Sequence, residues 1–146
     1  MSVDDAHTRP AGTSDDTVAA LGKLSEALEV VEDARGDLYS FHRKCGTADL
    51  TLGEAVTMLR DAGHDELADS IQTDLVGRNI LRGRWSFQVV EDYDDGYYAA
   101  FREHERAARE QLLAGRRHVF ESEMKQDRRT HGRPGHEATP EETGSR

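Results

Sequence analysis

The sequence predicts an all-α fold: a small helical bundle of three to five helices, with a long N-terminal amphipathic helix and disordered ends. Apolar residues in the central part of the chain recur at intervals of three and four, which is the spacing of one helix face. The run 84–90 has the residue types of a strand, but no second run is available to pair with it. Segments 1–17 and 125–146 contain only Val3 among Leu, Ile, Val and Phe, so neither can bury a core.

We predict one helical domain over residues 16–125, with a disordered tail at 1–15 and a disordered polar tail at 126–146. The chain has 146 residues and a net charge of −10, and its apolar residues suffice for a single core. No stretch approaches the ~20 apolar residues that span a bilayer, and the N-terminal segment lacks a signal-peptide pattern. The single cysteine, Cys45, agrees with a reducing compartment. We therefore expect a cytoplasmic protein with no membrane partner.

The first helix is predicted over residues 16 to 44. The segment before it, TSDD, supplies N-cap candidates and places acidic side chains at the positive end of the helix. Gly36 is expected to weaken or bend the helix. Apolar residues recur every seven positions, as in a coiled coil, at Leu24, Val31, Leu38 and Cys45.

Two shorter helices are expected next. Thr51 and Glu54 have the spacing of a capping box, which predicts a short helix from Thr51 to residue 62. A third helix is expected from residue 64 or 65 to about residue 81. Its apolar stripe consists of Leu67, Ile71 and Leu75.

Residues 83–95 are predicted to form an irregular or partly helical connector. The Asp95–Gly96 pair is typical of a turn, whereas several apolar residues around it keep helical spacing. From Gly96 to about Met124 the pattern is strongly helical, with a break expected at Gly115.

An aromatic cluster lies in and after this connector. Of the nine aromatic residues in the chain, six fall between residues 83 and 101: Trp85, Phe87, Tyr93, Tyr97, Tyr98 and Phe101. They are candidates for an interaction surface, because Tyr and Trp carry a polar tip on an apolar body. Burial in the core of one chain and a small-molecule pocket remain the alternatives.

Four arginines are candidates for contact with an anion. Arg82 and Arg84 flank the aromatic cluster, where they could face an anionic ligand that tyrosine hydroxyls orient. Arg116 and Arg117 begin a basic C-terminal segment that follows an acidic body. Contact with nucleic acid through this segment is one alternative. Pairing of these arginines with acids on neighbouring helices is the simpler interpretation, so we expect no nucleic-acid partner.

No standard catalytic or cofactor signature is present, so we expect no catalytic residue, no cofactor and no metal. The pairs Asp61-x-x-His64 and His118-x-x-Glu121 are the nearest approach to a di-iron motif, and neither completes it. Cys45 follows two cations that could activate a thiol. Its position at a predicted helix end and its seven-residue phase favour a small buried apolar residue instead.

The runs GRRHVFESEMK and RRTHGRPGHE, together with GRWSFQVVEDYDDGYY, resemble stretches of small uncharacterised helical proteins of high-GC actinobacteria. The resemblance covers most of residues 50–136. It implies a cytoplasmic bacterial protein and carries no activity.

These observations predict an interaction or accessory protein that self-associates, most simply as a homodimer with a further protein partner possible. The seven-residue phase of the first helix and the aromatic excess support this interpretation. A helical bundle that binds a small anionic ligand or a metal is the first alternative. Contact with nucleic acid is the second.

Overall fold

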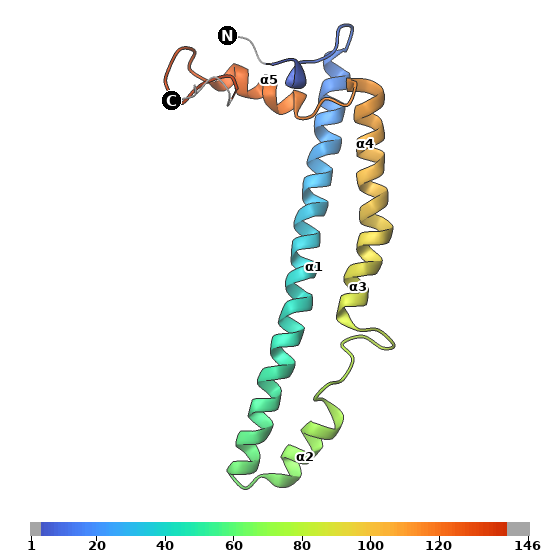
Figure 1. Ribbon diagram of the computed structural model, residues 1–146, viewed down its shortest axis with the longest axis vertical. Helices are drawn as coiled ribbons and strands as arrows, with labels where there is room; N and C mark the ends of the chain where they lie inside the picture. The colour runs from blue at the N-terminus through green and yellow to red at the C-terminus, as the bar shows by residue number, and fades with distance from the viewer. Residues whose placement is uncertain (1–3, 140–146) are drawn as a thin grey trace. The chain divides into compact units, whose positions relative to one another are not determined.

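The computed structural model describes residues 4–139, and every regular element in this range is helical. Only one isolated bridge, between Leu81 and Arg84, has the geometry of strand pairing among these residues. The all-α class is therefore confirmed. The elements are η1 (Asp5–His7), α1 (Asp15–Asp61), α2 (Asp65–Asp74), α3 (Ser86–Tyr93), the π-helical turn η2 (Asp94–Tyr98), α4 (Ala99–Leu113) and α5 (Val119–Arg128) (Figure 1).

Two compact units share the long helix α1. The first unit combines the residues up to Val30 with those from Ala100 onward, and the second consists of Val31–Ala99. The predicted limits of one domain at 16–125 and of disordered tails on either side stay predictions. Parts of both predicted tails are described by the structure, where they form η1 and the last residues of α5.

The core of the first unit is small and apolar. Val18 and Leu21 of α1 pack with Leu113 at the end of α4 and with Val119 at the start of α5. Beside this core lies a buried ion pair, in which Arg109 donates to Glu105 at 3.1 Å. Ser25 of α1 also donates to the Glu105 carboxylate, and Arg109 donates to the carbonyl of Gly115. The pair is thus hydrogen-bonded on both sides, as a buried charge requires.

Close packing between α1 and α5 depends on Gly22, which is buried. A β-carbon at this position would lie 2.6 Å from Cγ and 2.8 Å from Cβ of Phe120. Glycine therefore allows α5 to approach the backbone of α1 more closely than any other residue would.

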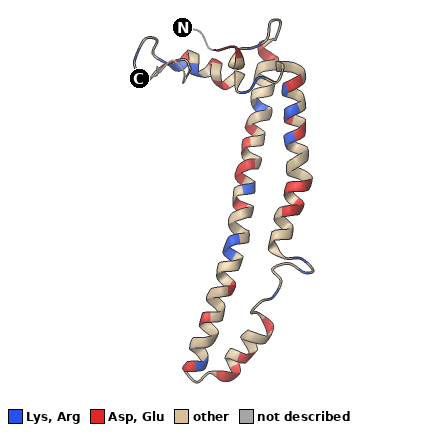
Figure 2. Cartoon of the chain, in the orientation of Figure 1, with Lys and Arg blue, Asp and Glu red and all other residues tan. Residues whose placement is uncertain are grey.

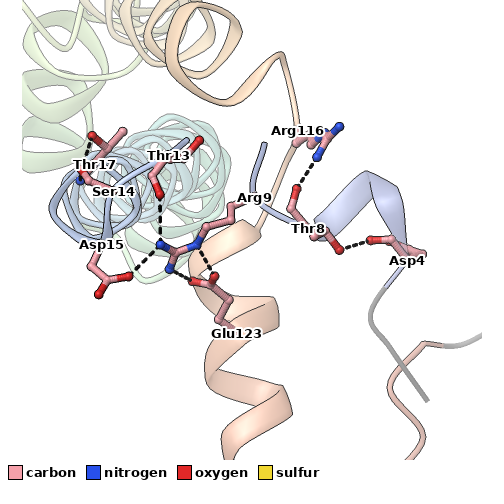
Figure 3. A network of polar contacts seen from close by, with 9 residues as sticks. All are labelled: Asp4, Thr8, Arg9, Thr13, Ser14, Asp15, Thr17, Arg116 and Glu123. Atoms are coloured by element: carbon pink, nitrogen blue, oxygen red, sulfur yellow. Dashed lines mark hydrogen bonds and ion pairs between the residues drawn. The ribbon is translucent and has the colours of Figure 1, made fainter. Parts of the chain in front are cut away.

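A polar network ties the N-terminal segment to α1 and α5 within this unit (Figure 3). Arg9 donates two hydrogen bonds to the Glu123 carboxylate, at 2.7 and 3.0 Å, and a third to Asp15 at 2.7 Å. These bonds, first those to Glu123, raise the pKa of Arg9. Ser14 caps α1, because its hydroxyl accepts from the Thr17 amide, so the predicted N-cap region is confirmed.

In the second unit, α1 carries a seam of inward-facing residues that repeat every seven positions. The apolar series predicted in the sequence continues well beyond Cys45. Its members in this unit are all buried or half-buried: Val31, Leu38, Cys45, Leu52 and Leu59. A second seven-residue series runs beside it and is polar in its middle, with half-buried Arg35, His42 and Asp49. The two series have the spacing of the a and d positions of a heptad seam.

Each polar residue of the seam meets a polar group on the segment that returns along α1. Arg35 donates to Asp94 at 2.7 and 3.0 Å. His42 shares a hydrogen bond of 2.8 Å with the Ser86 hydroxyl. Asp49 accepts from the amide of Gly77 at 2.8 Å. The returning segment is therefore held at three successive points.

The prediction that the first helix ends at residue 44 is wrong, and so is the separate helix from Thr51. α1 runs without interruption to Asp61. The capping-box residues lie inside it, where their amides already bond to earlier turns. Gly46 and Gly53 cost about 1 kcal/mol each in a helix interior. Burial of Leu52 and Val56 along the seam outweighs this cost.

The third predicted helix begins where expected but ends early. α2 covers Asp65–Asp74 and lies against the end of α1, where Ala68 is fully buried and Arg60 forms an ion pair with Asp69. After the C-cap at Leu75 the chain turns at Gly77, whose φ of +74° suits glycine. Capture of the Gly77 amide by Asp49 favours the loop over the helical continuation to residue 81.

The connector is partly helical, which is one of the two forms predicted for it. Residues 86–93 form α3, and only the part before it is irregular. The Gln88 side chain accepts from the Trp85 amide at 3.0 Å, which satisfies one free donor at the helix start, and Val90 is buried. Gly96 lies inside η2 rather than at a helix start. The break predicted near Gly115 is confirmed, since α4 ends at Leu113 and α5 begins at Val119.

Candidate interaction surface

The second unit exposes many more large apolar side chains than it buries. Its buried apolar residues are Val31, Val56, Ala68 and Val90. Its exposed ones are Tyr39, Phe41, Leu50, Met58, Leu67, Leu75, Ile80, Leu81, Trp85, Phe87 and Tyr97. Leu50 and Met58 are 74% and 71% exposed. Single exposed apolar residues are ordinary, but so many in one unit make its surface a candidate for interaction.

The aromatic cluster predicted from the sequence is split by the structure. Trp85 and Phe87 form an exposed pair at the start of α3, with ring centres 5.2 Å apart, and Trp85 is 56% exposed. Tyr97 is also exposed. Tyr93, Tyr98 and Phe101 are half-buried. Trp85, Phe87 and Tyr97 are thus accessible to solvent, whereas the other three rings are partly covered.

Tyr98 and Tyr93 belong to a charged aromatic cluster around Arg35. The Arg35 guanidinium lies 5.3 Å from the ring centre of Tyr98, and the ring of Tyr93 stacks on that of Tyr98. The Tyr98 hydroxyl donates to Glu32 at 2.7 Å. The hydrogen bonds from Arg35 lower the pKa of Asp94 and raise that of Arg35. Asp94 and Arg35 therefore both stay charged over a wider pH range than isolated side chains would.

The π-helical turn η2 places these groups together. The amide of Ala99 bonds to the carbonyl of Asp94, five residues back, which is the pattern of a π-turn. The extra residue changes the direction in which Asp94 and Tyr98 face relative to a continuous α-helix. Neither Arg35 nor Glu32 was predicted from the sequence to be part of a site. The signal for Arg35 was its seven-residue spacing from His42 and Asp49.

Two of the four candidate anion-binding arginines are used in contacts within their own units. Arg84 is paired with Asp92 in its own chain, and Arg116 donates to the carbonyl of Thr8 at 2.6 Å. Arg82 and Arg117 are exposed and form no ion pair among the described residues. Arg82 lies in the loop 78–83, which surrounds an open hollow of about 590 Å³.

The basic C-terminal segment is used partly for internal contacts. Arg129 is buried, and it donates to Gln126 and to the carbonyl of His136. The sequence offered no sign of this, because Arg129 lies among exposed basic residues. Together with the bond from Arg116 to Thr8, this leaves fewer arginines of the segment available to an anionic partner.

Potential metal and thiol groups are dispersed. Within residues 4–139, no three His, Cys, Asp or Glu side chains gather as a metal site would require. His64 and His118 precede helices α2 and α5 without capping them through their side chains. Cys45 is a half-buried free thiol on the seam of α1. None of the helices in the described range is long and apolar enough to cross a membrane.

Comparison with family models, curated proteins and solved structures finds no match to this chain.

Proposed function

We propose that this chain is a cytoplasmic interaction protein that self-associates as a homodimer through the apolar surface of its second unit. The observation that carries the proposal is the excess of exposed over buried large apolar side chains in Val31–Ala99. Covering apolar surface contributes about 25 cal/mol per Å², and a stable dimer covers roughly 1,200–2,000 Å² in total.

A second copy is the occupant that helix packing favours. In this unit, α1 has one face on its returning segment and leaves its other faces open. Two such helical pairs can bury their apolar residues against each other in a four-helix arrangement. A C2 dimer uses the same patch on both subunits, so the exposed patch of each copy is covered by the same patch of the other. Figure 2 shows acidic residues along α1 and α2. In the proposed dimer they remain at the rim, where they favour solubility and oppose further growth.

The test is the mass of the native chain in solution. We expect light scattering after size exclusion to give twice the 16.3 kDa chain mass at tens of micromolar, with dissociation on dilution. The association should persist in about 0.5 M salt, because apolar burial resists screening whereas surface charge contacts do not. A monomer at every concentration would refute the proposal. A dimer that dissociates fully in salt would assign association to the basic segment instead.

A further inference from the structure

A strip of six exposed residues runs from the loop before α3 to η2. We call it the α3 strip, and it consists of Arg82, Arg84, Trp85, Phe87, Glu91 and Asp95. Phe87, Glu91 and Asp95 follow one another at intervals of four, which places them along one side of this helical segment. Val90, three residues after Phe87, is buried at the edge of this side. Trp85 extends the apolar part through its ring contact with Phe87.

Charge is ordered along the strip. The arginines lie before the apolar pair, and the two acids lie after it. The stretch 75–90 contains three arginines and no acid, in a chain whose net charge is −10. Arg84 is neutralised by Asp92, whereas Arg82, Glu91 and Asp95 form no ion pair among the described residues. The strip therefore has one unpaired cation at its beginning and two unpaired anions at its end.

Such a strip is complementary to its own inverted copy. When two strips meet in antiparallel orientation, the positive end of each faces the negative end of the other, and the apolar centres coincide. A two-fold axis generates this arrangement, in which the same patch serves both subunits. Aromatic and arginine side chains at the centre of an interface are the types that contribute most to binding.

We infer that the α3 strip is the centre of the homodimer interface. Trp85 and Phe87 pack on their symmetry mates near the axis, and Arg82 faces the partner's Asp95. The inference rests on the self-association proposed above and adds its location, its antiparallel orientation and its charge pairing. An anionic membrane or nucleic acid fits less well, because Glu91 and Asp95 would be repelled by either.

Charge reversal tests the pairing directly. Arg82→Glu and Asp95→Arg each place like charges together twice in a dimer, so we expect each to raise the dissociation constant at least about tenfold. In an equimolar mixture of the two variants, a heterodimer of near wild-type affinity should form. One of its two contacts then joins the introduced glutamate to the introduced arginine, and the other keeps the native Arg82 and Asp95. The matched controls are Arg117→Glu in the first unit and Asp33→Arg, which lies on the side of α1 away from the seam.

The outcomes separate the two proposals. Circular dichroism confirms that each variant is folded, and sedimentation velocity measures association. A monomeric wild type refutes self-association and the strip together. A dimeric wild type whose two variants dimerise normally, or whose mixture is no better than either alone, overturns the strip and leaves self-association intact. Wild-type chain that sediments with phosphatidylserine vesicles, and loses this with Arg82→Glu, would assign the strip to a membrane and also overturn the inference.

Discussion

Gly22 gives a sharp test of how α5 packs on α1. In an exposed helix interior, Gly→Ala stabilises by about 0.5–1 kcal/mol, because alanine restricts the unfolded chain and favours the helix. At Gly22 the added β-carbon would lie 2.6 Å from Cγ of Phe120 and 2.8 Å from its Cβ. Carbon atoms in contact lie about 3.5–4.0 Å apart, so the overlap is close to 1 Å. We expect Gly22→Ala to destabilise the chain.

The magnitude follows from which atom must move. Rotation of the Phe120 ring cannot remove the overlap with its Cβ, since that atom is fixed to the backbone of α5. α5 must therefore shift, although the adjacent Val119 is locked in the core. Overpacking of this kind costs about 1–3 kcal/mol, against which the helix gain of up to about 1 kcal/mol is set. The net loss is up to about 2 kcal/mol.

Gly36 in the same helix provides the matched control, because nothing lies within 4 Å of its added β-carbon. Gly36→Ala should stabilise, and the difference between the two variants should equal the overpacking cost of about 1–3 kcal/mol. Urea unfolding followed by circular dichroism at about 222 nm, the helix band, measures both. Equal effects within about 0.5 kcal/mol would refute the packing argument. In a Phe120→Gly background, which removes the β-carbon that ring rotation cannot move, Gly22→Ala should no longer destabilise.

Three further predictions concern polar contacts. Arg35 lowers the pKa of Asp94 below its ordinary 3.8, so their contact stabilises the fold at neutral pH and this stabilisation is lost as pH falls through the lowered value. Urea titrations should therefore show that the difference in unfolding free energy between wild type and Asp94→Asn shrinks between about pH 5 and about pH 2. Glu105→Leu alone should destabilise by roughly 3 kcal/mol, since it leaves Arg109 buried without its partner, whereas replacing both by leucine should be close to neutral in calorimetry. Asp49→Ala should speed hydrogen exchange of the loop amide that it accepts from, with exchange elsewhere in α1 unchanged.

The course of α1 shows what the sequence could predict and what it could not. Its start and its helical class followed from the N-cap residues and the seven-residue spacing, which are local signals. Its end did not, because Thr51 and Glu54 offer a credible local helix start. Continuation of the same spacing through Leu52 and Leu59 was the signal that favoured one long helix. The spacing prevailed because burial along the seam contributes more than a cap does.

The candidate surface was predicted less completely, for a different reason. The concentration of aromatic residues near α3 was visible in the sequence, but their division between surface and packing was not. Exposure of Phe87 and burial of Val90 depend on which side of α3 faces α1. The residue types in this segment suit a strand, so its periodicity alone could not establish that side. The role of Arg35 depends on contacts across 59 residues of sequence, which local patterns do not encode.

The polar residues of the seam explain how the second unit selects one alignment. Leucine and valine at seam positions are nearly interchangeable, so an apolar seam could slip by one heptad at small cost. Arg35, His42 and Asp49 cannot slip, because each would leave its hydrogen-bond partner and remain half-buried without it. Their partners, in order, are Asp94, Ser86 and Gly77. Polar residues at these positions fix register but remove apolar contact area from the centre of the seam. A unit built in this way has a correctly aligned but thin core, and covering its exposed apolar side chains with a second copy would supply the missing burial.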